Sequence, residues 1–461
     1  MTADHASPIA ATQEQEVIRE RLILGLWSLA VMPITMNTTM FNVALPQIMK
    51  QFALTSTTAS WIVTGYSIVF AISSITFSRL SDYLPIRRLL TIGIIFLGAG
   101  SLLGMFSHHF IMLFASRVLQ AVGAGSGISL GVMLVTRYIP MSRRGRSMSM
   151  IISTATFGMG LGPVLGGVIT EYWGWNGLFL ITGLIVFVLP FLFRLLPREQ
   201  AQNVRFDFAG AFSIGVGVTG LLLFMTTNSL YALAAGVIFL YAFWMRIKRA
   251  SGPFVQPTLL KNMPYMLLSF IVFAAFAAHF ATLFLMPLML SRLFGLRSVY
   301  TGLIIFPGAM LSALLSNVVG RMIDRYGNHL ILRIGSIIML LGAVLFGFFS
   351  SISPIAILIV YIPLSLGVTM LTTSVSNEMS RILPKEQIGA GMGLSQLIQF
   401  VGGAFGVALS GKSIAWQKAI PLSSAFTHIY WGVATLVFLA GLSYLLYRAK
   451  QLSSLSSLAA K

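Results

Sequence analysis

Fourteen apolar segments, each long enough to cross a lipid bilayer, determine what this chain can fold into. A helix needs about 20 residues to cross the hydrocarbon core. Only 9% of the chain is charged and 57% is hydrophobic, whereas a soluble domain carries about 25% charged residues. We therefore predict an all-α integral membrane protein. Its spans are expected at 22–44, 57–78, 89–107, 110–136, 148–171, 176–196, 208–227, 231–247, 264–290, 299–320, 330–350, 354–376, 389–411 and 426–447.

The seventh and eighth segments have two interpretations. Only Asn228 and Ser229 supply a turn between them. If residues 208–247 formed one re-entrant hairpin, the chain would be a twelve-span protein with an insert. The alternative is a pair of full spans joined by a very short turn.

The net charge of +19 is distributed as membrane topology requires. With the N-terminus inside, Lys and Arg crowd the cytoplasmic loops, and the outer loops hold only Lys50, Arg292, Arg297, Lys412 and Lys418. This bias follows the positive-inside rule, and no nucleic-acid-binding motif accompanies it. The polar segment 1–20 has no basic region before an apolar core, so we expect no cleaved signal peptide. The sequence predicts a multi-pass cell-membrane protein with both termini cytoplasmic.

Two loops of similar sequence indicate an internal repeat. Arg79 precedes Asp82 by three residues after the second span, and Arg321 precedes Asp324 by three residues after the tenth. Parallel halves of this kind are typical of transporters, although chance similarity of two short basic loops is the alternative. The repeat predicts five regions: tail 1–21, six-helix bundle 22–200, two linker helices 201–262, six-helix bundle 263–447 and tail 448–461.

The repeated loops could act as a conformational gate. Asp82 and Asp324 lie near helix ends on the cytoplasmic side, where each can pair with Arg79, Arg321 or another arginine across the two halves. Such pairs can latch one conformation and break in another. The plainer interpretation, a topological turn, accounts for the arginines but not for the aspartates.

Arg117 lies inside the fourth apolar span, three residues before Gln120. A charge within the bilayer is costly, so we expect its side chain to face the bundle interior and to have a partner. The alternative is that Arg117 snorkels to the membrane surface.

The fifth span contains an unusual concentration of glycine around one proline. Glycines let helices approach closely, and proline removes one backbone hydrogen bond. The pattern predicts a pliable helix of antiporter type at the interface between the halves, although ordinary glycine packing is the alternative. The residues are Gly158, Gly162, Pro163, Gly166 and Gly167.

Several polar side chains within the spans could line a substrate path or cross-link helices by hydrogen bonds. The two interpretations are equally open from sequence. These residues are Asn37, Asn42, Tyr66, Asn317, Gln396 and Gln399.

Groups that could carry a proton through the membrane are few. His279 is the histidine deepest in a span, and its unperturbed pKa near 6.5 suits titration; a packing histidine is the commoner case. Glu378 is expected at the cytoplasmic end of the twelfth span, near the interface. None of the eleven acids falls at mid-membrane on the predicted boundaries.

No constellation of an enzyme or a resident cofactor is present in the sequence. The chain has no cysteine, which excludes disulfides and thiolate sites. A phosphate-binding loop of the Walker type and a metal-ligand cluster are also missing. We expect neither metal nor cofactor.

With these residues in view, the chain resembles the major facilitator superfamily. It is most similar to the fourteen-helix drug/proton antiporters, the tetracycline and quinolone efflux proteins of Gram-positive bacteria. The resemblance covers about residues 35–415. It rests on residues 42–46, the Asp82 and Asp324 loops, Arg117 with Gln120 and Gly123, the Gly162–Pro163 run, and the phrases 253–257 and 305–308. It implies two six-helix bundles, two extra central helices, a substrate cavity between bundles and export driven by proton entry.

The chain departs from that family where the family usually has acids or glycines. Asn37 and Leu161 stand where an acid is common, Ser78 and Pro85 replace loop glycines, and Ala121 replaces a glycine of the fourth span. Neutral, zwitterionic and anionic lipophiles are then as plausible as cationic drugs.

The sequence as a whole favours a secondary transporter that exports lipophilic compounds, coupled to protons and acting as a monomer among membrane lipids. A carrier of an amphiphilic lipid or metabolite without proton coupling is the second hypothesis. A non-transporting receptor or scaffold is the third, and it would not need the repeated loops, Arg117 or the glycine-rich helix.

Overall fold

The computed structural model describes residues 8–196, 206–250, 252–384 and 387–459, and this part of the chain is helical throughout apart from its turns. Fourteen helical segments are long and apolar enough to cross a membrane. The predicted fold of two six-helix bundles with two extra central helices is confirmed.

The N-terminal half contains six spans. The first five are single helices, and the sixth is made of three short pieces. They are α1 (Pro8–Gln51), α2 (Ser56–Leu80), α3 (Ile86–Met105), α4 (Phe110–Tyr138), α5 (Met141–Trp173), and then α6 (Gly177–Gly183), the 3₁₀ turn η1 (Leu184–Val188) and α7 (Leu189–Leu195).

The break in the sixth span has a local cause. Pro190 stands at the start of α7, where it has no N–H to donate, and its ring would clash with the carbonyl four residues earlier in a continuous helix. The chain relieves this by tightening into the 3₁₀ turn η1 just before the proline.

The two extra helices are full spans. They are α8 (Phe208–Thr227) and α9 (Leu230–Arg249), each of 20 residues. Asn228 ends α8 in the left-handed conformation, with φ of 58°, which asparagine tolerates well. Ser229 then caps α9 by accepting the Ala232 N–H. A left-handed residue followed by a capping serine is enough to reverse the chain between two helices that are each long and apolar enough to cross a membrane.

The C-terminal half follows after the short helix α10 (Pro257–Lys261). Its six spans are single helices, three of them with an internal proline. They are α11 (Met263–Arg292), α12 (Ser298–Tyr326), α13 (Asn328–Phe349), α14 (Pro354–Ile382), α15 (Ile388–Trp416) and α16 (Leu422–Ala459).

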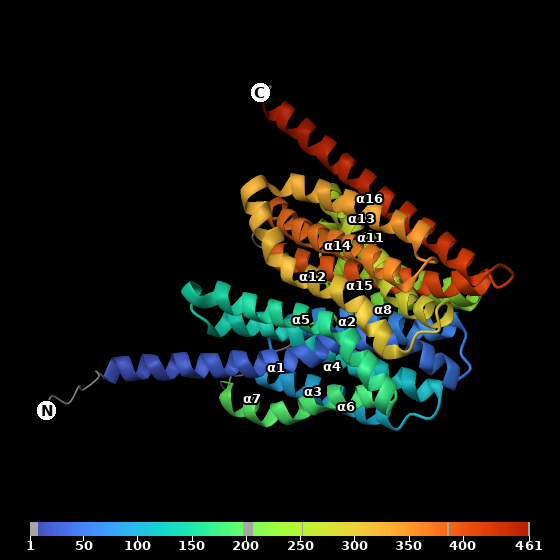
Figure 1. Ribbon diagram of the computed structural model, residues 1–461. Helices are drawn as coiled ribbons and strands as arrows, with labels where there is room; N and C mark the ends of the chain where they lie inside the picture. Colours follow the sequence, from blue (N-terminus) through green and yellow to red (C-terminus); the bar gives the residue numbers. More distant parts are fainter. Residues whose placement is uncertain (1–7, 197–205, 251, 385–386, 460–461) are drawn as a thin grey trace.

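The two halves lie side by side, and both ends of the chain emerge on the same side of the molecule (Figure 1). We name this side the termini face and the other side the opposite face. The halves meet along two seams, α5 against α12 and α2 against α15. Large apolar side chains such as Phe187 and Leu230, both 72% exposed, cover the outer surface. In a soluble protein such a surface would aggregate, whereas in a bilayer it contacts lipid.

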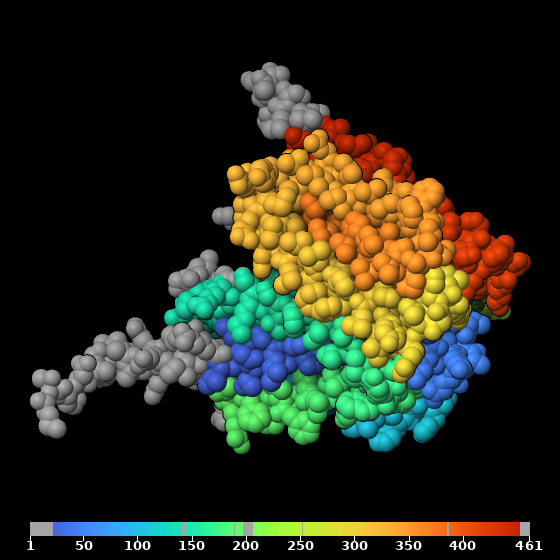
Figure 2. Space-filling model, in the orientation of Figure 1, coloured from blue at the N-terminus to red at the C-terminus, as the bar shows by residue number. Residues whose placement is uncertain are grey.

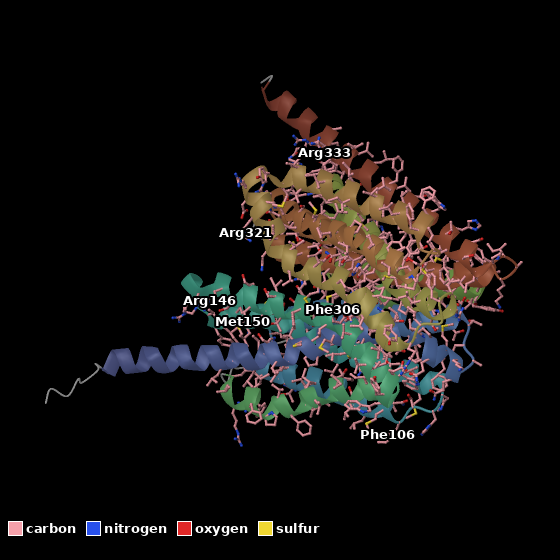
Figure 3. The ribbon with its side chains drawn as sticks, viewed as in Figure 1. Phe106, Arg146, Met150, Phe306, Arg321 and Arg333 are labelled. Carbon is pink, nitrogen blue, oxygen red and sulfur yellow. The ribbon has the colours of Figure 1, made fainter. Side chains whose placement is uncertain are left out.

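The seam between α5 and α12 is closed toward the opposite face and parts toward the termini face. In Figure 2 a notch separates the end of α5 from the end of α12 on the termini side. In Figure 3, Arg146 and Met150 of α5 lie on one side of this notch and Arg321 of α12 lies on the other. The structure therefore has one access side at the centre of the molecule.

Candidate functional site

A cavity of about 180 Å³ lies between the two halves. Helices α1 and α5 line it from the N-terminal half, and α11, α12 and α14 line it from the C-terminal half. Along α5 its lining extends from Pro163, at the closed seam, to Thr156, which lies nearer the termini face. The cavity thus begins where the seam closes and extends toward the notch.

The glycines of α5 form two faces that pack against two different helices. On the first face, added side chains at Gly158, Gly162 and Gly166 would collide with α1. Their spacing of four residues places them on one stripe, and the atoms they meet include the backbone carbonyls of Met32, Met36 and Met40. This face binds α5 to its own half.

The second face of α5 meets the other half. A side chain at Gly167 would overlap the Ser298 carbonyl of α12, and one at Gly302 of α12 would overlap the Pro163 carbonyl. Gly160 has more room, with Met310 of α12 at 3.5 Å. Helix α5 is therefore wedged between α1 and α12, and its second face forms the seam beside the cavity.

Pro163 creates a polar feature on the cavity wall. Because proline has no N–H, the carbonyl of Met159 four residues earlier has no helical partner. The hydroxyl of Thr39 on α1 donates to that carbonyl at 3.0 Å, and all three residues line the cavity. A hydrogen bond from α1 thus replaces the one that Pro163 removes from α5.

Arg117 is buried inside the N-terminal half, with 1% of its surface exposed. Its Nη1 donates to Asn37 Oδ1 at 2.5 Å and to Gln120 Oε1 at 2.9 Å. Its guanidinium lies over the rings of Phe41 and Tyr66, 4.0 and 4.1 Å from their centroids. The side chain faces the bundle interior, and among the described residues amide oxygens and aromatic faces, rather than a carboxylate, surround its charge.

A series of aromatic rings leads from Arg117 to the cavity. Tyr66 stacks near Phe70, whose ring lies 4.7 Å from that of Phe400 in the C-terminal half. Phe400 in turn lies 5.8 Å from Phe276 and 6.0 Å from Phe280. Phe276 and Phe280 line the cavity. A continuous row of aromatic rings, which we call the aromatic wall, therefore runs from the N-terminal half to the cavity.

His279 of α11 also lines the cavity. Its ring lies nearly parallel to that of Tyr361, with 6.4 Å between centroids. Within the described part of the chain its Nδ1 has no hydrogen-bond partner. The geometry therefore leaves one imidazole nitrogen available to a ligand or a proton.

The other expected path residues are distributed over both halves. Asn42 is 2% exposed, and neither atom of its amide has a partner among the described residues. Gln396 accepts a long hydrogen bond from Ser74 across the α2–α15 seam at 3.4 Å, and Gln399 donates to Ser395 on its own helix. Asn317 is exposed and lies two turns beyond Met310 on α12, toward the notch.

The two repeated loops lie at the termini face. Asp82, Asp324 and Arg321 are exposed, and none of them, nor the partly buried Arg79, makes an ion pair within the described residues. The first loop is held by Arg137, whose Nη2 donates to the Ser81 carbonyl at 2.6 Å. In this conformation the gate predicted from the loops is therefore not latched by an ion pair of these four residues within the described part of the chain.

Glu378 lies deeper than the sequence indicates, because α14 continues to Ile382. It is 3% exposed and accepts hydrogen bonds from Tyr447 Oη at 2.5 Å and Asn328 Nδ2 at 2.7 Å. His329 Nε2 lies 3.9 Å away. The carboxylate joins α13, α14 and α16 at the termini face and does not line the central cavity.

Sequence reasoning missed the contacts that close the opposite face. Arg297, just before α12, donates to Glu171 at the end of α5 at 2.5 Å, and the Ser298 N–H donates to the same carboxylate at 3.1 Å. The Glu171 carboxylate raises the pKa of Arg297 above its ordinary value. Arg297 therefore stays charged throughout the physiological range. Apart from their position at span ends, nothing in the local sequence indicates this pairing.

A second contact at the opposite face involves all three parts of the molecule. Thr226 near the end of α8 accepts from Trp61 of α2 at 3.3 Å through its hydroxyl. Its carbonyl accepts from Lys412 Nζ of α15 at 2.7 Å. The cation thus binds the negative end of the α8 dipole, and the extra helix bridges the α2–α15 seam.

Two helical halves that share a central cavity open to one side define a class of membrane transporters. The chain belongs to the Major Facilitator Superfamily, whose sequence pattern matches residues 27–407. It is a multi-pass membrane transporter of that family. No cluster of His, Cys, Asp or Glu that could hold a metal occurs among the described residues.

Two curated relatives illustrate the range of substrates in the family. The chain is 26% identical over 451 residues to the riboflavin transporter RibZ of Clostridioides difficile (strain 630), covering 94% of this chain and 99% of the relative. It is 25% identical over 409 residues to the multidrug resistance protein Stp of Mycobacterium tuberculosis (strain CDC 1551 / Oshkosh), covering 85% and 75% of the two chains.

Solved structures with the same fold include two transporters. A peptide transporter POT in complex with sulfate matches with a TM-score of 0.72 at 14% identity, covering 93% of this chain and 94% of the other. A bacterial homologue of the human lysosomal transporter Spinster, inward-facing and occupied, matches with a TM-score of 0.68 at 13% identity, covering 93% and 97%. At this identity the likeness establishes the fold.

Proposed function

We propose that the protein exports small lipophilic compounds across the cell membrane by alternating access, coupled to proton entry. The observation that supports this most strongly is the central cavity, which is closed toward the opposite face and extends toward the notch at the termini face. By the distribution of Lys and Arg, the termini face is the cytoplasmic one. A substrate would therefore enter the cavity from the cytoplasm or the inner leaflet.

To release the substrate, the two halves must open the opposite face and close the termini face. The α5–α12 seam would part near Glu171 and Arg297, and the notch beside Arg146 and Arg321 would close. Closure brings the repeated loops toward the other half, where Asp82 and Asp324 gain arginine partners. A pair that forms in one state and breaks in the other shifts the equilibrium by its difference in free energy.

Proton coupling needs a titratable group that the substrate can influence. His279 is the residue of this kind in the cavity wall, and its unpartnered Nδ1 makes a proton exchange site available. Binding of a proton and of substrate at one cavity would then be mutually dependent, which is the requirement for exchange.

A second candidate function is the transport of an amphiphilic metabolite without proton coupling. The hydroxyl groups on the cavity wall favour it, since they suit a ligand with many polar atoms. The similarity to a riboflavin transporter adds to this candidate.

A proteoliposome assay tests the proposal. Purified protein is reconstituted into vesicles with an imposed pH gradient, and lumenal pH is followed while a panel of lipophilic compounds and riboflavin is added. Compound-dependent proton movement is expected, with loss in Asp82→Asn and a flattened pH dependence in His279→Gln. Ser78→Ala, in the same loop, is the matched control for folding and insertion.

The outcomes separate the candidates. Solute movement without proton movement would favour the metabolite carrier. Absence of any solute movement by folded protein would contradict both transport proposals. An Asp82→Asn variant as active as the unaltered protein would contradict the gating role of the loop.

A further inference from the structure

The chemistry of the cavity wall selects among substrates, and four rings dominate one side of it. They come from α11 and α14 of the C-terminal half: Phe276, His279, Phe280 and Tyr361. The Phe400 ring packs behind Phe276 and Phe280 and continues the aromatic wall toward the N-terminal half. Aromatic faces bind flat apolar rings by offset or edge-on stacking, so this wall suits a planar ligand.

Uncharged polar groups lie among the remaining, partly apolar, lining residues. Six serine and threonine side chains reach the cavity from four helices of both halves: Thr39, Thr156, Ser312, Ser365, Thr369 and Thr372. Ser312 and Ser365 bond to each other at 2.8 Å, whereas Thr369 and Thr372 bond back to their own helix. Hydroxyls both donate and accept, so this surface can pair with ring oxygens and nitrogens of a neutral ligand.

The residues that line the cavity carry no fixed charge: none of them is Asp, Glu, Lys or Arg. Arg117 and its partner Asn37 lie outside the lining, and Asn37 faces α4 whereas Thr39, two residues later on α1, faces α5 and the cavity.

A cation entering this cavity would lose its hydration and gain no carboxylate in return, which is costly. An uncharged ring system avoids that cost. We propose that the cavity binds planar aromatic compounds bearing oxygen or nitrogen acceptors and no positive charge, and that it discriminates against cations. This inference rests on the proposed transport function for its biological meaning, but the binding it predicts is measurable on its own.

Binding in lipid nanodiscs tests the inference directly. Riboflavin serves as the uncharged planar probe and ethidium as a planar cation, and fluorescence anisotropy reports both. The unaltered protein is expected to bind riboflavin at least about tenfold more tightly than ethidium, a difference of ~1.4 kcal/mol. Equal affinities, tighter binding of ethidium, or no saturable binding of riboflavin would overturn the proposal.

A substitution that adds a negative charge to the cavity wall is expected to improve cation binding. Thr369→Asp places a carboxylate in the cavity, and Thr369→Asn has the same shape without the charge. Ethidium affinity is expected to rise by about tenfold in the first variant and to stay unchanged in the second. If Thr369→Asp does not yield folded protein, Thr372→Asp with Thr372→Asn repeats the comparison at a neighbouring position. An equal effect of the acid and the amide would overturn the electrostatic argument.

Transport measured on the same preparations separates this inference from the proposed function. Vesicles that move ethidium as efficiently as riboflavin would sustain the transporter and overturn the charge selectivity. Selective binding with no movement of any solute would uphold the selectivity and contradict the transport proposal.

Discussion

Arg117 is the residue whose surroundings differ most from what a membrane interior normally provides. A buried cation is usually paired with an acid, but here the position opposite Arg117 is Asn37. The two rings and two amide oxygens around the guanidinium stabilise it while leaving its net charge in place. Arg117 therefore joins α1, α2 and α4 inside the N-terminal half.

Replacing Asn37 by aspartate tests this interpretation. The new carboxylate would stand where Arg117 already donates at 2.5 Å, and a charge-assisted hydrogen bond is roughly twice as strong as a neutral one. We expect Asn37→Asp to raise the melting temperature of the purified protein by a few degrees. Asn42→Asp, on the same helix but without an arginine contact, is the control and is expected to lower stability. A destabilised Asn37→Asp variant would show that Arg117 does not need a counter-charge.

The sequence predicts the residue types of the site better than their contacts. Arg117, Gln120, Asn37 and His279 are visible because polar groups within apolar runs are rare. Glu378 shows the limit of this approach, because its burial depends on Tyr447 and Asn328 from two other helices. Long-range packing of this kind leaves no mark in the local sequence.

At the scale of elements, α5 shows how one helix can serve both the stability of a half and the motion between halves. Its Gly158, Gly162 and Gly166 stripe fits against α1, and its Gly160 and Gly167 side faces α12. The sequence predicts a glycine-rich pliable helix, but the division into two faces appears only once the neighbours of the helix are known.

Two alanine substitutions on α5 distinguish its faces. In Gly162→Ala the new methyl group would overlap Thr39 Oγ1 and lie 2.9 Å from the Met36 carbonyl, whereas in Gly160→Ala the nearest atom is 3.5 Å away. We expect the first substitution to destabilise the protein by about 1–3 kcal/mol and the second to be neutral, measured by thermal unfolding in detergent. Equal stabilities would contradict the packing of α5 on α1.

The fourteen spans and their order follow from the sequence because each needs only length and apolar composition. The hairpin of α8 and α9 is the exception, since a two-residue turn was compatible with either of two structures. Asn228 makes the tight turn possible because it accepts the left-handed conformation that ends α8, and each helix then has the 20 residues that a span needs.

The extra helix α8 is expected to stabilise the closed opposite face through Thr226. Lys412→Met keeps the length of the side chain and removes the bond to the Thr226 carbonyl. We expect this variant to increase labelling of a cysteine introduced at Ser60, which is buried against Gly411 across the α2–α15 seam, by a membrane-impermeant reagent added to the face of the membrane opposite the termini. Lys418→Met, in the loop beyond α15, is the control. Unchanged labelling would show that α8 does not restrain the α2–α15 seam.

At the scale of the whole molecule, the proposed transport cycle requires that one face closes when the other opens. The Glu171–Arg297 pair and the Thr226 contacts hold the opposite face closed while the notch at the termini face is open. Because the Glu171–Arg297 pair is partly exposed, it contributes little to overall stability and is screened by salt. Its role is therefore expected in the balance between conformations rather than in the free energy of unfolding.

The absence of cysteine from the chain makes the most direct test practical. Spin labels at Arg146→Cys and Arg325→Cys report the termini face, and labels at Tyr172→Cys and Tyr300→Cys report the opposite face. Distances between the labels in nanodiscs are measured by double electron–electron resonance, with and without Glu171→Gln and with and without riboflavin. Alternating access predicts that Glu171→Gln lengthens the distance at the opposite face and shortens the distance at the termini face. Distances that remain fixed under every condition, or that lengthen together, would contradict the account.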